Sequence, residues 1–415
     1  MKAAQRPIVV TGMGVISPLG NDLATTWQRL TQGESGVATL DELVSEELPV
    51  KIAARVQGFN PEDYLDRKEA RRLAAFTHYA VAAADEGLQM ACLDLEQEDR
   101  TRVGVEIGSA LGGSSIIEEQ RLVFQQRGPK GVNPSLIPAI LINTAACYVS
   151  IHFGAKGPIG APVAACATGT VAVGNAARAL ALGEADVMIC GGTDSVLTPF
   201  SITAFSRLGA LSSRPVPPQE ACAPFDRDRD GTVLGEGAAI LVLETLDHAQ
   251  DRGARILAEV AGYCLTGDAY HTVAPDPSGE GAARAIRGAL LDARTAPENL
   301  DWICAHGTGT QMNDLAETVA IKKALGEAAF RVPVSSIKAS VGHMLGGAGA
   351  ISCLAAVQAI LFGLLPPTLN YHTPDPQCDL DYVPNQARQK PVSNVLINSF
   401  GFGGQNACLV FRSAK

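Results

Sequence analysis

The sequence lacks the cysteine pairs and the histidine–cysteine spacings with which small domains hold disulfides or zinc. Its ten cysteines are scattered along the chain, and none belongs to a C-x-x-C pair. Free thiols of this kind are typical of a reducing compartment. We therefore expect a cytoplasmic protein that has no metal site.

Long apolar runs are also missing. No stretch is expected to reach the roughly 18 apolar residues of a membrane-spanning helix. The longest candidate, residues 354–365, contains Gln358 and is interpreted as a core helix. The chain enters a predicted strand at residues 7–10, which leaves no room for a secretory signal peptide. We expect a protein that is neither inserted into a membrane nor exported.

Positive charge is scarce, with 33 lysines and arginines against 43 acidic residues and a net charge of −10. This balance argues against nucleic acid as the main partner. The basic run at residues 67–72 is a local exception. It is either a solvated helix face or a docking patch for an acidic protein, and both interpretations stay open. The candidate docking residues are Lys68, Arg71, Arg72, Arg127, Lys130 and Arg207.

What the chain does contain is typical of a soluble, tightly packed α/β enzyme. It has 415 residues, of which 47% are hydrophobic and 18% are charged, and 42 are glycines. This length is sufficient for a large core. We expect either two domains or one large duplicated body.

The chain also contains an internal duplication, whose elements recur in the same order. Short apolar strands alternate with helices, which predicts mostly parallel sheets covered by helices. The two bodies, residues 1–253 and 254–415, are expected to pack against each other. The matching elements are residues 8–14, 76–90, 103–108, 187–192 and 238–243 in the first half, and 256–262, 280–294, 302–307, 395–398 and 407–411 in the second.

The third strand of each half leads into a candidate site. In the first half, Cys166 lies between a predicted buried strand at residues 160–163 and a predicted helix at residues 171–182. The thiol is therefore placed at a helix N-terminus, where free amides and the macrodipole stabilise a thiolate and bind an oxyanion. Cys166 is either a covalent nucleophile or one of the many inert buried thiols.

The second half supplies two histidines and a lysine. His306 ends a strand and lies in a loop of glycines and threonines, while Lys338 and His343 follow the strand at residues 332–336. Active sites in such sheets lie beyond the carboxyl ends of the strands. If a pseudo-twofold axis relates the halves, these three side chains and Cys166 converge on one cleft. Two imidazoles beside a thiol can hold a carbonyl or move a proton.

Two acidic residues near His306 have competing interpretations. Asp314 and Glu317 have the spacing of a capping box that begins a helix ending at Gly326. Glu317 alternatively pairs with a buried Lys338, because an unpaired buried ammonium is costly.

Six separated motifs resemble those of the β-ketoacyl-acyl carrier protein synthases, nearest to type II, and the match spans nearly the whole chain. The resemblance implies a thiolase-like fold, which is itself an internal duplication layered α-β-α-β-α. The motifs are residues 165–169, 222–231, 268–271 and 306–310, Lys338 with Gly342 and His343, and residues 398–404.

The resemblance also implies a two-step condensation. An acyl chain moves from acyl carrier protein to Cys166, and malonyl-carrier then loses carbon dioxide and attacks the thioester. The expected enzyme is an acyltransferase of fatty acid or related polyketide synthesis. It is expected to be a homodimer, with a heterodimeric partner subunit as the alternative, and to need neither a metal nor another cofactor, because its substrates arrive on phosphopantetheine.

Individual roles follow from the same resemblance. The backbone amides of Cys166 and Phe402 are expected to form the oxyanion hole. His306 and His343 are expected to hold the malonyl thioester, and Lys338 to orient them with the support of Glu317 and Asp314. The expected substrate-binding residues are Leu111, Leu136 from the second subunit, Thr308, Thr310, Phe400 and the gate Phe402.

The sequence departs from the family pattern at three places: Leu111, Thr272 with Val273, and Gly309. These changes leave the acyl chain length and the pathway open. One alternative is a chain-length-factor-like subunit, which lacks the nucleophile, so the presence of Cys166 argues against it. Another is a thiolase acting on coenzyme A. It would need a second catalytic cysteine near the C-terminus, whereas Cys408 lies in an apolar strand.

Overall fold

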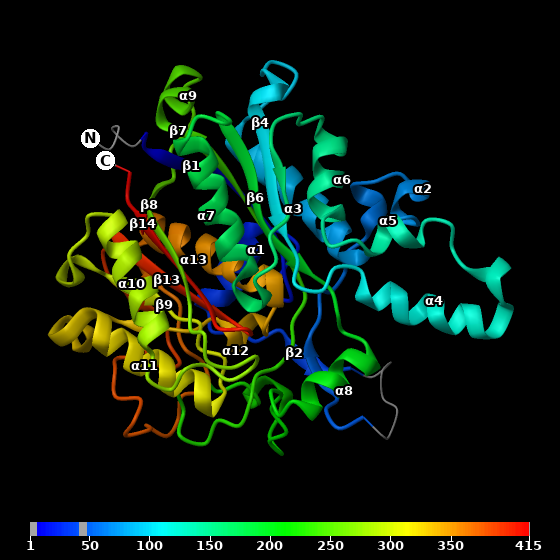
Figure 1. Cartoon of the computed structure of the whole chain (residues 1–415). Coiled ribbons are helices and arrows are strands. Elements are labelled where there is room, and N and C mark those ends of the chain that lie inside the picture. The colour runs from blue at the N-terminus through cyan, green and yellow to red at the C-terminus, as the bar shows by residue number, and fades with distance from the viewer. Residues whose placement is uncertain (1–5, 41–47, 415) are drawn as a thin grey trace.

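The computed structural model describes residues 6–40 and 48–414, and this part of the chain is built around a ten-stranded sheet (Figure 1). The strand order is β10-β9-β13-β14-β8-β1-β7-β6-β4-β5. The first half supplies β1 (Ile8–Ile16), β4 (Val103–Gly108), β5 (Ile159–Gly160), β6 (Val187–Asp194) and β7 (Gly237–Thr245). The second half supplies β8 (Ala258–Gly267), β9 (Trp302–Cys304), β10 (Val334–Ser335), β13 (Asn394–Gly401) and β14 (Gln405–Arg412).

The two halves of the sheet are built alike. The five strands of each half can be numbered one to five in the order in which they occur along the chain. From the outer edge of the sheet to its centre, each half then has strands three, two, four, five and one. Within each half, the first, second, third and fourth strands share one direction, and the fifth, β7 or β14, runs against both of its neighbours. Because β1 and β8 are antiparallel to each other, the strands of the two halves run in opposite directions. The halves join where β1 pairs with β8, with Val9 opposite Glu259 and Val10 opposite Ala258. The predicted duplication is confirmed, while the boundary after residue 253 stays a prediction.

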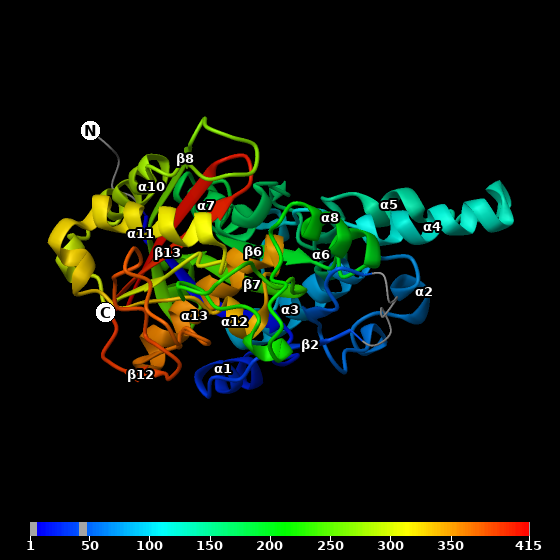
Figure 2. The same ribbon diagram turned by 90° about the horizontal axis from the view of Figure 1, so that it is seen from below.

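Helices form three layers around the two half-sheets (Figures 1 and 2). The central layer is α7 (Thr168–Ala181) and α13 (Ala348–Phe362), which pack against each other between the half-sheets. α3 (Ala75–Ala91) covers β1 and β7 from outside, and α10 (Glu280–Asp292) with α11 (Gln311–Leu325) covers the second half. The layer order α-β-α-β-α is the expected one.

The two central helices approach each other closely because small residues lie between them. A Cβ atom on Gly169 would lie only 2.6 Å from the backbone nitrogen of Ala350, so a larger residue does not fit there without a shift of the backbone. Val173 of α7 and Ile351 of α13 belong to one apolar core that draws on both halves. The start of α7 is therefore fixed against the second half of the chain.

One segment passes the length and composition test for a membrane span. Residues Leu345–Phe362 cover 18 residues with a mean hydropathy of 1.9, so the expectation that no stretch reaches this length was wrong. The segment is 83% buried inside the protein, as a core helix is. The predicted core helix is therefore confirmed, although it ends at Phe362, and residues Leu364–Leu365 form β11 instead.

The predicted strand at residues 160–163 was also misplaced. β5 consists of Ile159 and Gly160 alone, at the outer edge of the sheet, where Ile159 is 49% exposed. Val163, expected in the core, is 51% exposed. Apolar composition predicted burial here, but an edge strand leaves one side of its backbone uncovered.

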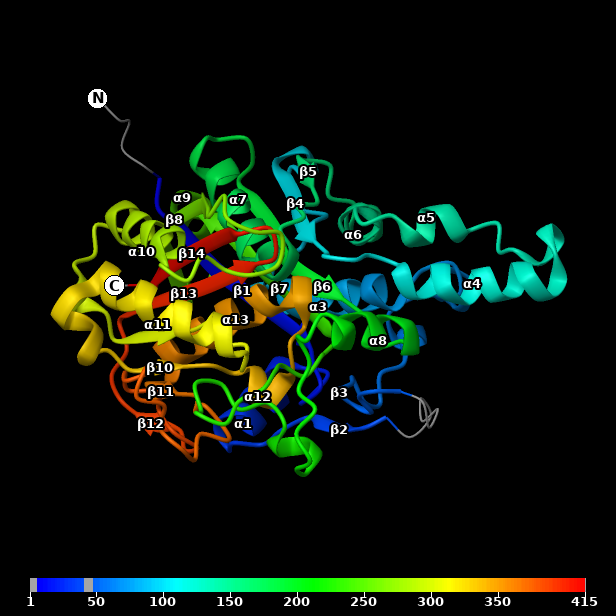
Figure 3. The ribbon, with the colours of Figure 1, turned by 60° about the horizontal axis from the view of Figure 1, so that its bottom comes forward.

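An arm projects from the first half, as all three ribbon views show (Figures 1, 2 and 3). It consists of α4 (Ser114–Arg127), no residue of which is buried, and α5 (Leu136–Ile140). The remaining helices and strands are α1 (Leu23–Thr31), α2 (Arg67–Ala70), α6 (Thr144–Phe153), α8 (Pro199–Arg207), α9 (Leu246–Asp251), α12 (Lys338–Val341), β2 (Val37–Thr39), β3 (Ile52–Ala54) and β12 (Arg388–Gln389).

Candidate active site

Cys166 lies in a short 3-10 turn, Ala165–Ala167, that leads directly into α7. Ala165 has a φ of +46°, in the left-handed region that residues with a side chain seldom adopt. Thr168 braces this turn, because its hydroxyl donates to the Ala165 carbonyl at 2.7 Å and accepts from the Ala164 amide at 2.9 Å. The predicted position of the thiol at a helix N-terminus is confirmed.

The resting thiol is protonated at neutral pH. Burial raises the pKa of Cys166 to about 11, although the positive charge of Lys338 and the Phe402 amide both lower it. The charge of Asp194 adds to the increase. The sequence predicted that the helix N-terminus would stabilise a thiolate, but loss of solvent outweighs the helix dipole and the amides.

His306 and His343 line the same cavity as Cys166, so the structure brings together three groups from two halves of the chain. The two imidazole rings lie 5.6 Å apart and nearly perpendicular, at 82°. Burial lowers the pKa of both histidines well below the usual value, and the charge of Lys338 lowers it further. Both rings are therefore neutral at physiological pH.

Hydrogen bonds assign which ring nitrogen carries the proton. Nδ1 of His343 accepts from the Leu345 amide at 3.3 Å, and Nδ1 of His306 lies 3.4 Å from the Lys338 ammonium, which has only protons to donate. The proton of each neutral ring is thus on Nε2. Within residues 6–40 and 48–414, Nε2 of His343 is buried without a partner. It is a donor available to a substrate.

Lys338 is 4% exposed and lies behind the cavity. Its ammonium donates to the His306 carbonyl as well as to the ring. Burial lowers the pKa of Lys338, and the charge of Glu317 opposes that change. The lysine therefore fixes the position and the tautomer of His306 rather than reaching the cavity itself.

The expected direct pair between Glu317 and Lys338 is not formed. The Glu317 carboxylate instead accepts from the backbone amides of His306 and Gly307, at 2.8 and 2.7 Å, and from the Asn398 side chain at 3.0 Å. Burial raises the pKa of Glu317 to about 7, against the lowering effect of these three donors. The acid holds the backbone of the histidine loop.

The capping-box interpretation of Asp314 was also wrong. Thr310 is the N-cap of α11, and the helix begins three residues before Asp314. Asp314 is fully buried and accepts from the amides of Phe225 and Gly309, at 2.8 and 3.2 Å. Its charge is balanced by Arg229, with a nitrogen–oxygen distance of 3.6 Å. The predicted helix end at Gly326 is confirmed.

Two buried charged residues of this region are not among the predicted site residues. Arg229 is 3% exposed and links Asp314 to Asp375, whose carboxylate lies 2.7 Å away. Asp194, at the end of β6, is fully buried and accepts four hydrogen bonds: from the Ser109 hydroxyl and from the amides of Ala110, Leu111 and Gly346. The only signal for Asp194 was a carboxylate at the carboxyl end of a predicted strand.

The other predicted substrate residues, except Leu136, line two cavities. Thr308, Thr310, Phe400 and Phe402 line the Cys166 cavity, and the two threonine hydroxyls lie 2.8 Å apart. Leu111 does not line it. Leu111 borders a neighbouring apolar cavity of about 620 Å³ between α4 and α8. Two residues, Phe205 and Leu208, line both cavities. Leu136, on α5, lines neither cavity.

The loop that carries Phe402 is tied to a second loop. The Gly403 amide donates to the Thr272 carbonyl at 2.8 Å, and the Asp268 amide donates to the Gly404 carbonyl at 2.9 Å. The Asn406 side chain donates to the Asp268 carboxylate at 2.6 Å. Residues 268–272 and 401–404 therefore form one rim of the cavity.

The candidate docking residues are exposed but lie on separate elements. Lys68 is in α2, and Arg71 and Arg72 follow it directly. Arg127 ends α4 and Lys130 follows at the far end of the arm, while Arg207 ends α8 (Figure 3). Among the described residues, no group of three or more histidine, cysteine, aspartate or glutamate side chains could hold a metal ion.

Comparisons with known proteins agree on one family. Residues 5–249 match the family described as "Beta-ketoacyl synthase, N-terminal domain", and residues 257–372 match its C-terminal domain. The chain is 45% identical over 408 residues to the 3-oxoacyl-[acyl-carrier-protein] synthase 2 of Synechocystis sp., covering 98% of each. It is 45% identical over 405 residues to the synthase of the same name from Staphylococcus aureus, again covering 98% of each.

Solved structures give the same answer. A type II polyketide ketosynthase, solved with its acyl-carrier protein and bound to a hexaketide, has a TM-score of 0.92 and 36% identity, covering 99% of this chain and all of the other. A β-ketoacyl synthase from Burkholderia phymatum has a TM-score of 0.91 and 34% identity, with the same coverage. The fold is thus the thiolase-like fold of the ketosynthases, and the chain belongs to the β-ketoacyl synthase family.

Proposed function

We propose that this protein is a β-ketoacyl-acyl carrier protein synthase. It extends a Cys166-bound acyl chain by decarboxylative condensation with malonyl-carrier. The observation that carries the proposal is the convergence of Cys166 with two neutral imidazoles, His306 and His343, in one cavity. In this assignment, residues 1–253 supply the nucleophile, and residues 254–415 supply the histidines and Lys338.

The first half-reaction loads the acyl group. Sγ of Cys166 attacks the carbonyl carbon of the acyl thioester, and the amides of Cys166 and Phe402 receive the negative charge on the oxygen. The new Sγ–carbon bond replaces the carbon–sulfur bond to phosphopantetheine. The proton of the Cys166 thiol leaves with the pantetheine sulfur, so no external base is consumed.

The second half-reaction uses the two histidines. Their Nε2–H groups donate to the carbonyl oxygen of malonyl-carrier, and they stabilise the enolate that forms when the carboxylate leaves as carbon dioxide. The enolate carbon attacks the Cys166 thioester, which forms the carbon–carbon bond. The Cys166 sulfur leaves and takes up one proton. Neutral rings suit this role, because a donor that keeps its proton stabilises the charge without transferring the proton.

The surrounding residues hold this arrangement. Lys338 orients His306, while Glu317 and Asp314 fix the backbone of the histidine loop. Thr308 and Thr310 bind phosphopantetheine. Phe402 forms the gate between Cys166 and the acyl pocket, and Phe400 lines the substrate cavity beside it.

The acyl chain enters the apolar cavity that Leu111 borders, beyond Phe205 and Leu208.

We assign the enzyme to the cytoplasm and to a homodimer in which Leu136 of a second copy closes this cavity. The exposed apolar residues of the first half support a second copy: Ile117 on α4 is 49% exposed, Ile137 on α5 63% and Ile151 on α6 72%. The alternative is a heterodimer with a related partner subunit. Measuring the mass of the native assembly distinguishes this heterodimer from the homodimer. Acyl carrier protein docks on the exposed basic residues Lys68, Arg71, Arg72, Arg127, Lys130 and Arg207.

Two variants of Cys166 test the proposal. Cys166→Ala should abolish condensation of labelled malonyl-carrier. Cys166→Gln should lose acyl loading but keep carbon dioxide release, because a carboxamide imitates the acyl thioester in the oxyanion hole. Condensation by the alanine variant at the wild-type rate would overturn the proposal. A mass spectrum of the wild type with a panel of acyl-carriers identifies both the loaded residue and the preferred chain length.

A further inference from the structure

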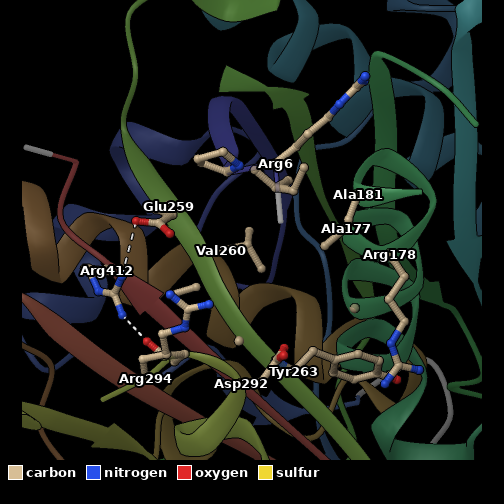
Figure 4. A pocket seen from close by; sticks show the side chains of 16 residues that line it. Arg6, Ala177, Arg178, Ala181, Glu259, Val260, Tyr263, Asp292, Arg294 and Arg412 are labelled. Carbon is tan, nitrogen blue, oxygen red and sulfur yellow. Dashed lines mark hydrogen bonds and ion pairs between the residues drawn. The ribbon is translucent and has the colours of Figure 1, made fainter. Parts of the chain in front are cut away.

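A third cavity lies on the seam between the two halves of the sheet (Figure 4). It has a volume of about 300 Å³ and opens where β8 leaves its short pairing with β1. The end of α7 and the end of α10 complete its walls. It shares no lining residue with the Cys166 cavity, so it is a separate site. We call it the seam cavity and define it by Arg6, Arg178, Val260, Tyr263, Arg294 and Arg412.

The seam cavity is cationic in an acidic protein. Four arginines line it against two carboxylates, Glu259 and Asp292, although the whole chain carries a net charge of −10. Both carboxylates are engaged. Glu259 forms an ion pair with Arg412 at 3.5 Å, and Asp292 accepts from the Tyr263 amide at 3.1 Å.

Arg412 has further partners, whereas Arg178 and Arg294 form no ion pair within the described part of the chain. Arg412 donates to the Ala293 carbonyl and, at 3.1 Å, to the Thr295 hydroxyl. In residues 6–40 and 48–414, no carboxylate lies within 4.0 Å of the guanidinium groups of Arg178 and Arg294. Figure 4 shows Arg294 on one side of Val260 and Arg178 on the other, while the Arg6 side chain points away. Two positive charges without a counter-ion therefore flank the cavity.

Arg178 lies beside a second unused donor. Its guanidinium stands over the Tyr263 ring, 4.4 Å from the centroid, which holds it in place. Tyr263 is only 6% exposed, and its hydroxyl has no hydrogen-bond partner within the described chain. Buried hydroxyl groups are seldom left without a partner. An anionic oxygen that reaches both groups from the cavity would accept a hydrogen bond from each of them.

The floor of the seam cavity is apolar. Ile8 of β1, Val260 of β8, and Ala177 and Ala181 of α7 line it beneath the arginines. An inorganic ion gains no binding free energy from an apolar surface, whereas a ligand with a short apolar part gains it by burying that part against the floor. A cavity of about 300 Å³ is large enough for a small metabolite and too small for a protein segment.

We propose that the seam cavity binds a small organic anion. Its carboxylate or phosphate oxygens contact Arg178, Arg294 and the Tyr263 hydroxyl, and its short apolar part rests on Ile8, Ala177, Ala181 and Val260. The shared chemistry is an anionic oxygen group on a short apolar body. Binding is measured directly, so this proposal stands or falls separately from the Cys166 chemistry.

The test is calorimetric titration of the full-length protein with four probes that share or lack each feature. Hexanoate and hexyl phosphate have both the charge and the chain, 1-hexanol has only the chain, and inorganic phosphate has only the charge. We expect the two anionic hexyl compounds to bind, and their affinity to fall as salt is raised, because the arginines are exposed. The stronger of the two identifies the anionic group.

Variants locate the binding. Arg178→Gln and Arg294→Gln should each weaken it by about fivefold, and the double variant by about twentyfold or more, because each removes a charge-assisted contact. The matched control is Arg284→Gln. This arginine is also exposed, but it pairs with Glu280 on α10 and lies outside the cavity. The Arg284→Gln variant should bind the hexyl compounds as tightly as the wild type does. Ala181→Phe, which fills the floor, should abolish binding without removing a charge.

Three outcomes would overturn the proposal. Affinity that is unchanged in the Arg178 and Arg294 variants would place the hexyl compounds elsewhere, for instance in the acyl cavity. Binding of 1-hexanol as tight as that of hexanoate would show that the charge is not recognised. Binding of inorganic phosphate as tight as that of hexyl phosphate would show that the apolar floor contributes nothing. Circular dichroism of each variant confirms that it is folded.

Discussion

Asp194→Asn gives the sharpest prediction about how the site is held. The Asp194 carboxylate lies between the two halves of the chain. One oxygen accepts from the Ser109 hydroxyl and the Leu111 amide, at 2.7 and 3.1 Å, and the other from the amides of Ala110 and Gly346, at 2.9 and 2.6 Å. All four partners are donors, so the carboxylate must be ionised to accept from all of them.

Asparagine keeps the shape of the side chain but replaces one of these oxygens with a donor. Whichever way the amide group turns, two buried donors lose their acceptor, at about 1–3 kcal/mol each. A neutral amide costs less to bury than a carboxylate, which offsets part of this loss. We therefore expect the free energy of unfolding to fall by about 2–3 kcal/mol.

The assay is urea denaturation followed by tryptophan fluorescence, together with acyl loading of Cys166 by mass spectrometry. Loading of longer acyl chains should fall more than that of short ones, because the variant loosens the loop that carries Leu111 beside the acyl cavity. The control is Asp186→Asn, whose partly exposed pair with Arg102 is worth at most about 1 kcal/mol. Equal unfolding midpoints for the Asp194 variant and the wild type would show that the four hydrogen bonds to this carboxylate do not stabilise the fold.

Three further predictions follow from the structure. Gly169→Ala should destabilise the protein by about 1–3 kcal/mol, because its Cβ would lie 2.6 Å from the backbone of α13. The control Gly267→Ala should not destabilise it, because its Cβ would lie no nearer than 4.0 Å to any atom outside its neighbouring residues. Thermal melting compares the two variants. Alkylation of Cys166 by iodoacetamide should keep rising with pH beyond pH 9, because burial raises the pKa of the thiol to about 11, and a plateau near pH 7 would contradict this. Charge reversal at Lys68, Arg71 and Arg72 should raise the KM for the acyl carrier in a salt-sensitive manner, and unchanged kinetics would leave that cluster as a solvated surface.

The sequence predicted most of the fold, because the duplicated strands are short apolar runs with glycine at their ends. A strand that is buried on both faces of a sheet has a short apolar run in its sequence. The runs of β4 and β9 could therefore be found independently and then recognised as the matching strands of the two halves. The same criterion failed at β5, since Ile159 and Val163 are apolar but lie at an open edge. It also underestimated the apolar segment at Leu345–Phe362, in which alanine and glycine alternate with larger residues.

Within the site, the sequence predicted that Cys166, His306 and His343 lie close together, because each lies in a loop of small residues after a predicted strand, and they do line one cavity. It could not identify how they are held. Asp194 is separated from Gly346 by 152 residues and from Ser109 by 85, and no local pattern records such contacts. The expected pair of Lys338 and Glu317 was wrong for a related reason. Two opposite buried charges suggested an ion pair, but backbone amides that carry no sequence signal satisfied the carboxylate.

The central claim is that one cavity serves a sulfur nucleophile from the first half and two hydrogen-bond donors from the second. The most direct measurement is of acyl loading and carbon dioxide release, made separately in the double variant His306→Ala/His343→Ala. In this variant Cys166 should still become acylated, while release of carbon dioxide from malonyl-carrier should fall by at least about 100-fold, as it does when a donor to a developing oxyanion is removed. Carbon dioxide release at the wild-type rate in that variant would contradict it.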